Sequence, residues 1–172
     1  MNNAAGLGLT LLTSLMLSVS CTNPGESAKL PQNYETRILQ VDDTLLQGIR
    51  NLALARGSPS SEKEMLEWQL EDARKAQALS RRALREARGV TPPTRYQIGH
   101  ELLIRLYSDS QAFFSLEAER ITHEIDGNPT SVLEKQLAEA AATLLQLRTQ
   151  VMEALPFLRE ESLPTMLTGP VP

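Results

Sequence analysis

The chain has 172 residues, and its 17 Lys and Arg against 21 Asp and Glu leave a mildly acidic formal net charge of -4. This balance argues against the strongly basic face that nucleic-acid binding requires, and a single cysteine excludes a disulfide within a monomer. Leu, Ala, Glu, Gln and Arg are abundant, and alternating β-branched runs are missing, which predicts an all-α protein.

The N-terminus carries an uncharged, mostly apolar stretch over residues 4–19 (AAGLGLTLLTSLMLSV), and the chain turns polar directly after Cys21. A secretory signal needs a short apolar stretch that is followed by small residues at the cut site. The stretch is shorter than the ~20 apolar residues that span a bilayer. Residues 1–20 are therefore predicted to be a signal peptide.

The segment Leu17-Ser18-Val19-Ser20-Cys21 resembles the lipobox of bacterial lipoproteins. The resemblance implies cleavage before Cys21 and lipidation of Cys21, with palmitate among the acyl chains, so that the protein is anchored to a membrane of the cell envelope on its periplasmic side. In a double-membraned cell it favours the outer membrane, because Thr22 stands where the family's retention signal has Asp. Two alternatives stay open: an ordinary cleaved signal that leaves a free thiol, and an uncleaved N-terminal anchor.

Residues 21–32 follow as the lipidated cysteine and a polar segment that contains Pro and Gly, which predicts a flexible tether. Beyond it, apolar residues recur at steps of three and four, which places them on one face of a helix. The predicted helices cover residues 34–56, 62–88, 94–126 and 132–155.

Local signals mark the ends of these helices. Asn33 is a predicted N-cap, and two Ser-x-x-Glu pairs, Ser61 with Glu64 and Ser131 with Glu134, predict capping boxes. Helix stops are predicted at Gly57, Gly89 and Gly127.

Loops of only a few residues make consecutive helices antiparallel neighbours. We therefore expect an up-down-up-down four-helix bundle over residues 33–157, with the Leu-rich stripe around Leu144 as the spine of its core. Residues 158–172 contain Pro164, Pro170 and Pro172 and predict an irregular C-terminal tail.

No catalytic, metal or cofactor site is predicted. A ferritin-like di-iron site needs Glu-x-x-His on two helices, but Gln97 stands three residues before His100 and Arg120 stands three before His123. Both histidines are expected at the surface or its boundary. There is no Gly-rich phosphate loop, and the glutamates of the third helix are interpreted as a solvated face, so we expect a non-enzymatic protein without a cofactor.

Charge is segregated along residues 62–88, with acids in the first half and Arg81, Arg82, Arg85 and Arg88 in the second. One interpretation is that these charges only complement the helix dipole. The other is that the arginines dock an acidic partner, anionic lipid or wall polymer. Trp68 is either a boundary residue or an interface anchor. These five residues are the predicted partner-binding set.

The sequence favours a membrane-anchored, non-enzymatic envelope lipoprotein whose helical bundle binds or positions another envelope protein. The alternative is a small-ligand or metal-responsive periplasmic bundle that acts as a sensor or chaperone. Nucleic acid is not an expected partner.

Overall fold

The computed structural model describes residues 24–54 and 58–158. Within these ranges the chain forms four α helices and one 3-10 turn, and no strand occurs there. The elements are α1 (Pro24–Leu54), α2 (Glu62–Arg88), η1 (Thr94–Tyr96), α3 (Gln97–Ile125) and α4 (Ser131–Ala154). The all-α prediction is therefore confirmed for the described residues.

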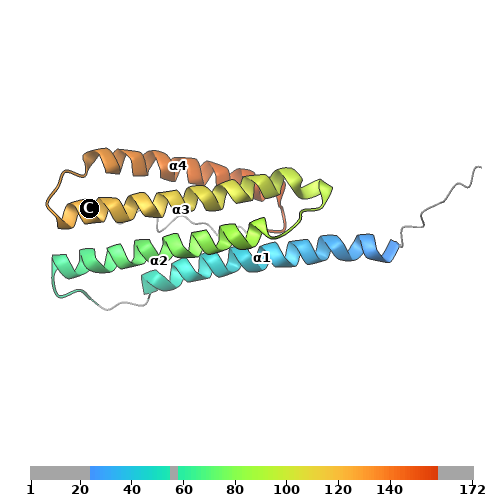
Figure 1. Cartoon of the computed structure of the whole chain (residues 1–172), viewed down its shortest axis with the longest axis horizontal. Coiled ribbons are helices and arrows are strands. Elements are labelled where there is room, and N and C mark those ends of the chain that lie inside the picture. The colour runs from blue at the N-terminus through green and yellow to red at the C-terminus, as the bar shows by residue number, and fades with distance from the viewer. Residues whose placement is uncertain (1–23, 55–57, 159–172) are drawn as a thin grey trace, which may run out of the picture.

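The helices lie side by side along the long axis of the molecule (Figure 1). Helices that follow one another in the chain pack together, most extensively α2 with α3, then α3 with α4 and α1 with α2. The pair α1 and α4 is not among the helices that pack extensively. The molecule is thus built outward from the central pair α2 and α3.

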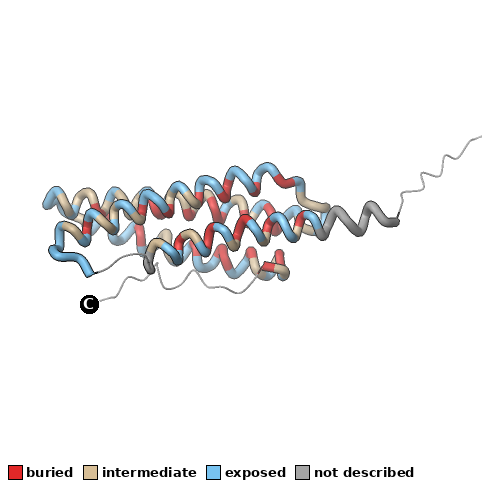
Figure 2. The backbone as a smooth tube through the Cα atoms, turned by 90° about the horizontal axis from the view of Figure 1, so that it is seen from below, coloured by how far each residue is buried: buried red, intermediate tan, exposed pale blue. Residues whose placement is uncertain are grey.

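Buried residues gather on the inward faces of the helices, as Figure 2 shows, and the predicted apolar stripes supply most of them. Leu144, in the middle of the α4 stripe, is 2 % exposed, which confirms its predicted place in the core. Small residues on the second half of α2 are also buried, and they allow α3 to approach closely: Ala76, Ser80, Ala83 and Ala87.

Helix α1 begins at Pro24, earlier than predicted, so the N-cap assigned to Asn33 is wrong. The backbone of residues 24–32 is helical and not the flexible tether that their polarity predicted. The apolar periodicity starts only at Tyr34, which is buried, but helix formers precede it and Pro24 occupies the first turn, where no N–H is needed. In Figure 1, the N-terminal part of α1 extends beyond the ends of the other helices.

One of the two predicted capping boxes forms in part. The Ser61 hydroxyl accepts the Glu64 N–H at 3.2 Å, while the Glu64 carboxylate accepts the N–H of Ser60, at 2.7 Å, instead of that of Ser61. The second box is wrong, because Ser131 is already the first residue of α4. Thr130 precedes it, and its hydroxyl donates to the Glu134 carboxylate at 2.6 Å.

Gly127 ends α3 as predicted and has a φ of 71°. Its N–H donates to the Glu124 carbonyl at 3.1 Å, and the Asn128 N–H donates to the His123 carbonyl at 2.8 Å. These two bonds form a Schellman motif, which favours glycine because of its left-handed conformation. Gly89 ends α2 in a right-handed conformation, and Gly57 lies outside the described residues.

Candidate functional site

The four predicted arginines are all exposed on the last turns of α2, and Ala83 and Ala87 between them face the core. In Figure 1 this part of α2 lies beside the middle of α1. Within the described ranges no ion pair or hydrogen bond engages the side chains of Arg81, Arg85 or Arg88. We call these three residues the arginine surface.

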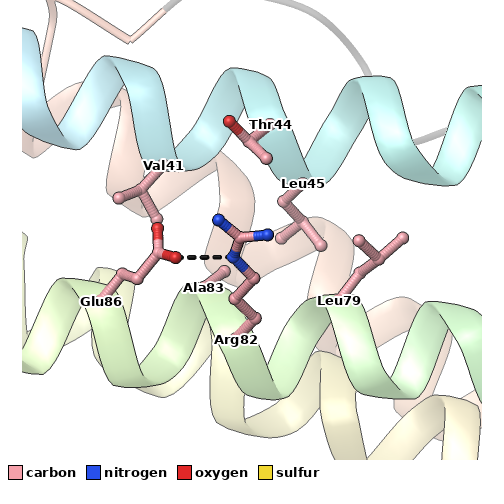
Figure 3. A pocket seen from close by; sticks show the side chains of 7 residues that line it. All are labelled: Val41, Thr44, Leu45, Leu79, Arg82, Ala83 and Glu86. Carbon is pink, nitrogen blue, oxygen red and sulfur yellow. Dashed lines mark hydrogen bonds and ion pairs between the residues drawn. The ribbon is translucent and has the colours of Figure 1, made fainter.

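Arg82 differs from the other three because it covers the junction of α1 and α2. Its Nε lies 2.6 Å from the Glu86 Oε1 atom, and this hydrogen bond is the main reason why the pKa of Arg82 is raised above its usual value. Figure 3 shows its guanidinium extending toward α1, over a hollow of about 10 Å³ that is lined by Val41, Thr44, Leu45, Leu79, Arg82, Ala83 and Glu86. Room for roughly one water makes this a packing defect and not a ligand pocket.

Trp68 lies far from the arginine surface. It lies on the first half of α2, about 20 Å from Arg81 along the helix axis by the rise per residue. Its side chain is half-buried and already makes an interaction within the molecule. The structure therefore favours the boundary interpretation of Trp68.

A buried ionic cluster links three helices, and the sequence analysis missed it. The Arg148 guanidinium on α4 donates two hydrogen bonds to the Asp42 carboxylate on α1, at 2.9 and 2.8 Å. The Tyr107 hydroxyl on α3 donates to the same carboxylate at 2.9 Å. Asp42 is 3 % and Arg148 is 4 % exposed. Burial, together with the Asp42 charge, raises the pKa of Tyr107 well above its usual value.

This cluster joins α1 to α4 by one bidentate pair with fixed geometry. A buried pair of this kind contributes little net stability, because desolvation of both ions offsets their attraction. It penalises alternative registers strongly, since any shift would leave a buried charge unpaired. A sequence signal did exist: Arg148 is the only charged residue between Ala140 and Met152.

A second polar contact lies at the end of the molecule where α3 begins. The Tyr34 hydroxyl on α1 and the His100 Nδ1 atom lie 3.0 Å apart, and both residues are buried. Tyr34 also stacks on Tyr96, with ring centroids 5.4 Å apart, and meets the edge of Phe157. Burial lowers the pKa of His100 and, with Tyr96, raises that of Tyr34 to about 12.

The expectation for His100 was therefore wrong: α1 and the aromatic rings cover it, and no periodicity within α3 could reveal that cover. His123 agrees with the expectation, being half-exposed with its Nδ1 atom 3.5 Å from the Pro129 carbonyl oxygen. Over residues 24–54 and 58–158, no three or more His, Cys, Asp or Glu side chains are grouped so that they could hold a metal ion.

Cys21 lies outside the described residues, so nothing in the structure tests its predicted lipidation. Among the helices of the described part, none is long and apolar enough to cross a membrane. In comparisons with known proteins, no family model, no curated protein and no solved structure matches this chain.

Proposed function

We propose that this chain is a non-enzymatic lipoprotein of the cell envelope, anchored through Cys21, whose helical domain binds or positions another envelope protein. We also propose that the four helices form an up-down-up-down bundle with an N-terminal lipid anchor and an irregular C-terminal tail. The packing of consecutive helices, joined by short loops, supports this topology.

The arginine surface is the observation that carries the proposal. Arg81, Arg85 and Arg88 are exposed and take part in no ion pair within the described ranges. The helix dipole rewards cations only within the last turn, by ~0.3–1 kcal/mol each, and Arg81 lies outside that turn. Guanidinium groups held along one helix suit a partner that presents carboxylates, because arginine binds carboxylates in a bidentate geometry.

Anchoring is supported by the sequence around Cys21. Only Thr22 and Asn23 separate Cys21 from the first helical residue, Pro24. Two or more acyl chains give stable anchoring, because each buried CH₂ contributes ~0.8 kcal/mol. We expect Cys21→Ser to abolish palmitate labelling and membrane retention, and labelling at the wild-type level would contradict the anchor.

The partner-binding role is tested with a triple variant, Arg81→Gln, Arg85→Gln and Arg88→Gln. The matched control removes three exposed cations from the first half of the same helix: Lys63→Gln, Arg74→Gln and Lys75→Gln. Both variants should have a free energy of unfolding within about 1 kcal/mol of that of wild type, because exposed charges contribute little to stability. Recovery of the cross-linked envelope partner should fall strongly for the first variant only, and most at low salt. Equal recovery for both variants would remove the arginine surface from the proposed function.

A further inference from the structure

The outward side of α2 carries a continuous strip of residues at alternating steps of three and four. Such steps keep residues on one side of a helix, as on the contact face of a coiled coil. The first residue of the strip is partly exposed, and the other seven are exposed. We call this set the α2 strip: Glu64, Glu67, Glu71, Arg74, Ala78, Arg81, Arg85 and Arg88.

The α2 strip is acidic in its first half and basic in its second half. Glu67 lies 3.8 Å from Lys63, and Glu71 lies 2.6 Å from Lys75, one turn away on the same helix. These four side chains are more than half exposed, so the two pairs are weak and exchange readily with other cations. The second half ends in the arginine surface, whose side chains take part in no ion pair within the described ranges.

We propose that a second copy of this chain pairs with the α2 strip, with the two α2 helices antiparallel and centred at position 76. In this alignment each glutamate of the strip faces an arginine of the other copy. The facing positions are 67 with 85, 71 with 81, and 64 with 88. The remaining pair is Arg74 with Ala78, whose small side chain leaves room for the arginine.

The order of the charges selects this orientation. A parallel pair of α2 helices would place glutamate opposite glutamate and arginine opposite arginine, which repel each other. In the antiparallel pair the two-fold axis repeats each contact, so the three kinds of ion pair occur twice. They extend over about 36 Å of helix by the rise per residue. Because exposed ion pairs determine orientation and salt dependence more than affinity, we expect a weak dimer.

This inference rests on the arginine surface as a docking site, which is part of the proposed function. It assigns to that surface one acidic partner of known structure, the first half of α2 in a second copy. A second copy and an envelope protein would therefore compete for the same guanidinium groups. The inference does not depend on the lipid anchor, so the full chain with Cys21→Ser serves as the reference protein.

Analytical ultracentrifugation of the purified reference protein measures the association without any envelope partner. We expect a monomer–dimer equilibrium whose dissociation constant rises at least about tenfold between about 0.02 and 0.3 M NaCl, because salt screens exposed charges. A reference protein that stays monomeric up to about 1 mM at low salt would overturn the proposal.

Charge reversal tests whether the α2 strip is the contact. One variant has Glu67→Arg and Glu71→Arg, and the other has Arg81→Glu and Arg85→Glu. Each variant alone should dimerise at least about tenfold more weakly, because like charges then face each other, and an equimolar mixture should restore the dimer. The control, Glu139→Arg with Glu153→Arg, makes the same change of charge at exposed positions of α4 and should dimerise like the reference protein. Variants that dimerise like this control would refute the contact, and the salt dependence of the reference protein decides the proposal if a variant fails to fold.

Disulfide cross-linking tests the orientation. Position 74 faces position 78 in the antiparallel pair, so two single-thiol chains are made from the reference protein, one with Arg74→Cys and one with Ala78→Cys. Under mild oxidation the mixture of both chains should form a covalent dimer faster than either chain alone. Faster cross-linking of each chain with itself would indicate a parallel pair and would overturn the proposal.

The failure of this inference is distinguishable from the failure of the proposed function. If the reference protein is monomeric, but Arg81→Gln with Arg85→Gln and Arg88→Gln lowers recovery of the envelope partner, the inference is wrong and the proposed function stands. If the predicted dimer forms, but this triple variant recovers the envelope partner as its control does, the arginine surface serves self-association alone.

Discussion

The buried pair of Asp42 and Arg148 gives the sharpest test of how the helices are held together. Asp42→Ala leaves the guanidinium buried, and removal of one partner from a buried pair costs ~3–5 kcal/mol. The Tyr107 hydroxyl loses its acceptor as well, at a cost of ~1 kcal/mol. We therefore expect a total loss of roughly 4–6 kcal/mol. At ~2–4 °C per kcal/mol for a domain of this size, the Tm falls by roughly 10–20 °C.

Chemical denaturation followed by circular dichroism measures this loss of unfolding free energy, and two further variants serve as controls. Asp43→Ala removes the neighbouring, half-exposed carboxylate and should change stability by no more than about 0.5 kcal/mol. The double variant Asp42→Leu with Arg148→Met removes both charges and should return to within about 1 kcal/mol of wild type, since an apolar replacement leaves no ion unpaired. An Asp42→Ala protein as stable as Asp43→Ala would refute the buried geometry, because a solvated carboxylate would explain both results.

Two further predictions concern the end of the molecule where α3 begins. In Gly99→Ala the new methyl carbon would lie 2.7 Å from two Leu155 side-chain carbons. We therefore expect overpacking to lower the free energy of unfolding by ~1–3 kcal/mol, as measured by urea denaturation. An unchanged midpoint would show that α3 and α4 are not in close contact there. Because burial lowers the pKa of His100, the unfolded chain binds this proton more readily than the folded chain. The contribution of His100 to the free energy of unfolding should therefore be fully present above about pH 6.5. It should be lost as the pH falls from there through the lower pKa that His100 has in the folded state. Urea midpoints measured from pH 7.5 to 5 give the dependence of stability on pH, and His100→Asn should reduce this dependence. If both proteins show the same dependence, it arises from other titratable groups.

The sequence allowed the helices to be predicted because their evidence is local. Apolar residues at steps of three and four define the buried stripe of α4 around Leu144 without any knowledge of its neighbours. Ser61 begins a helix and Gly127 ends one as expected, because caps depend on nearby backbone groups. The start of α1 was misplaced because periodicity reports burial, and Pro24 lies in helix that extends past the other helices.

The two polar contacts could not be predicted because each joins residues that are far apart in the chain. Asp42 meets Arg148, and Tyr34 meets His100, only after α1 has packed into the domain. Arg148 stands out in the sequence as the only charged residue of an uncharged stretch, but no local pattern identifies its partner. All four arginines that the sequence singled out on α2 are exposed, and Arg82 contributes in addition to the α1–α2 junction.

The early start of α1 also determines how far an anchored domain can search for its partner. A flexible linker of twelve residues would have a root-mean-square length of roughly 19 Å and would let the domain rotate freely. A helix from Pro24 to Asn33 instead fixes about 15 Å of that distance. In the proposed lipoprotein, the distance between the start of the helix and the packed domain would therefore be set by a helix and not by a coil. The domain would stay close to the membrane that anchors it, which favours partners that are themselves bound to the same membrane.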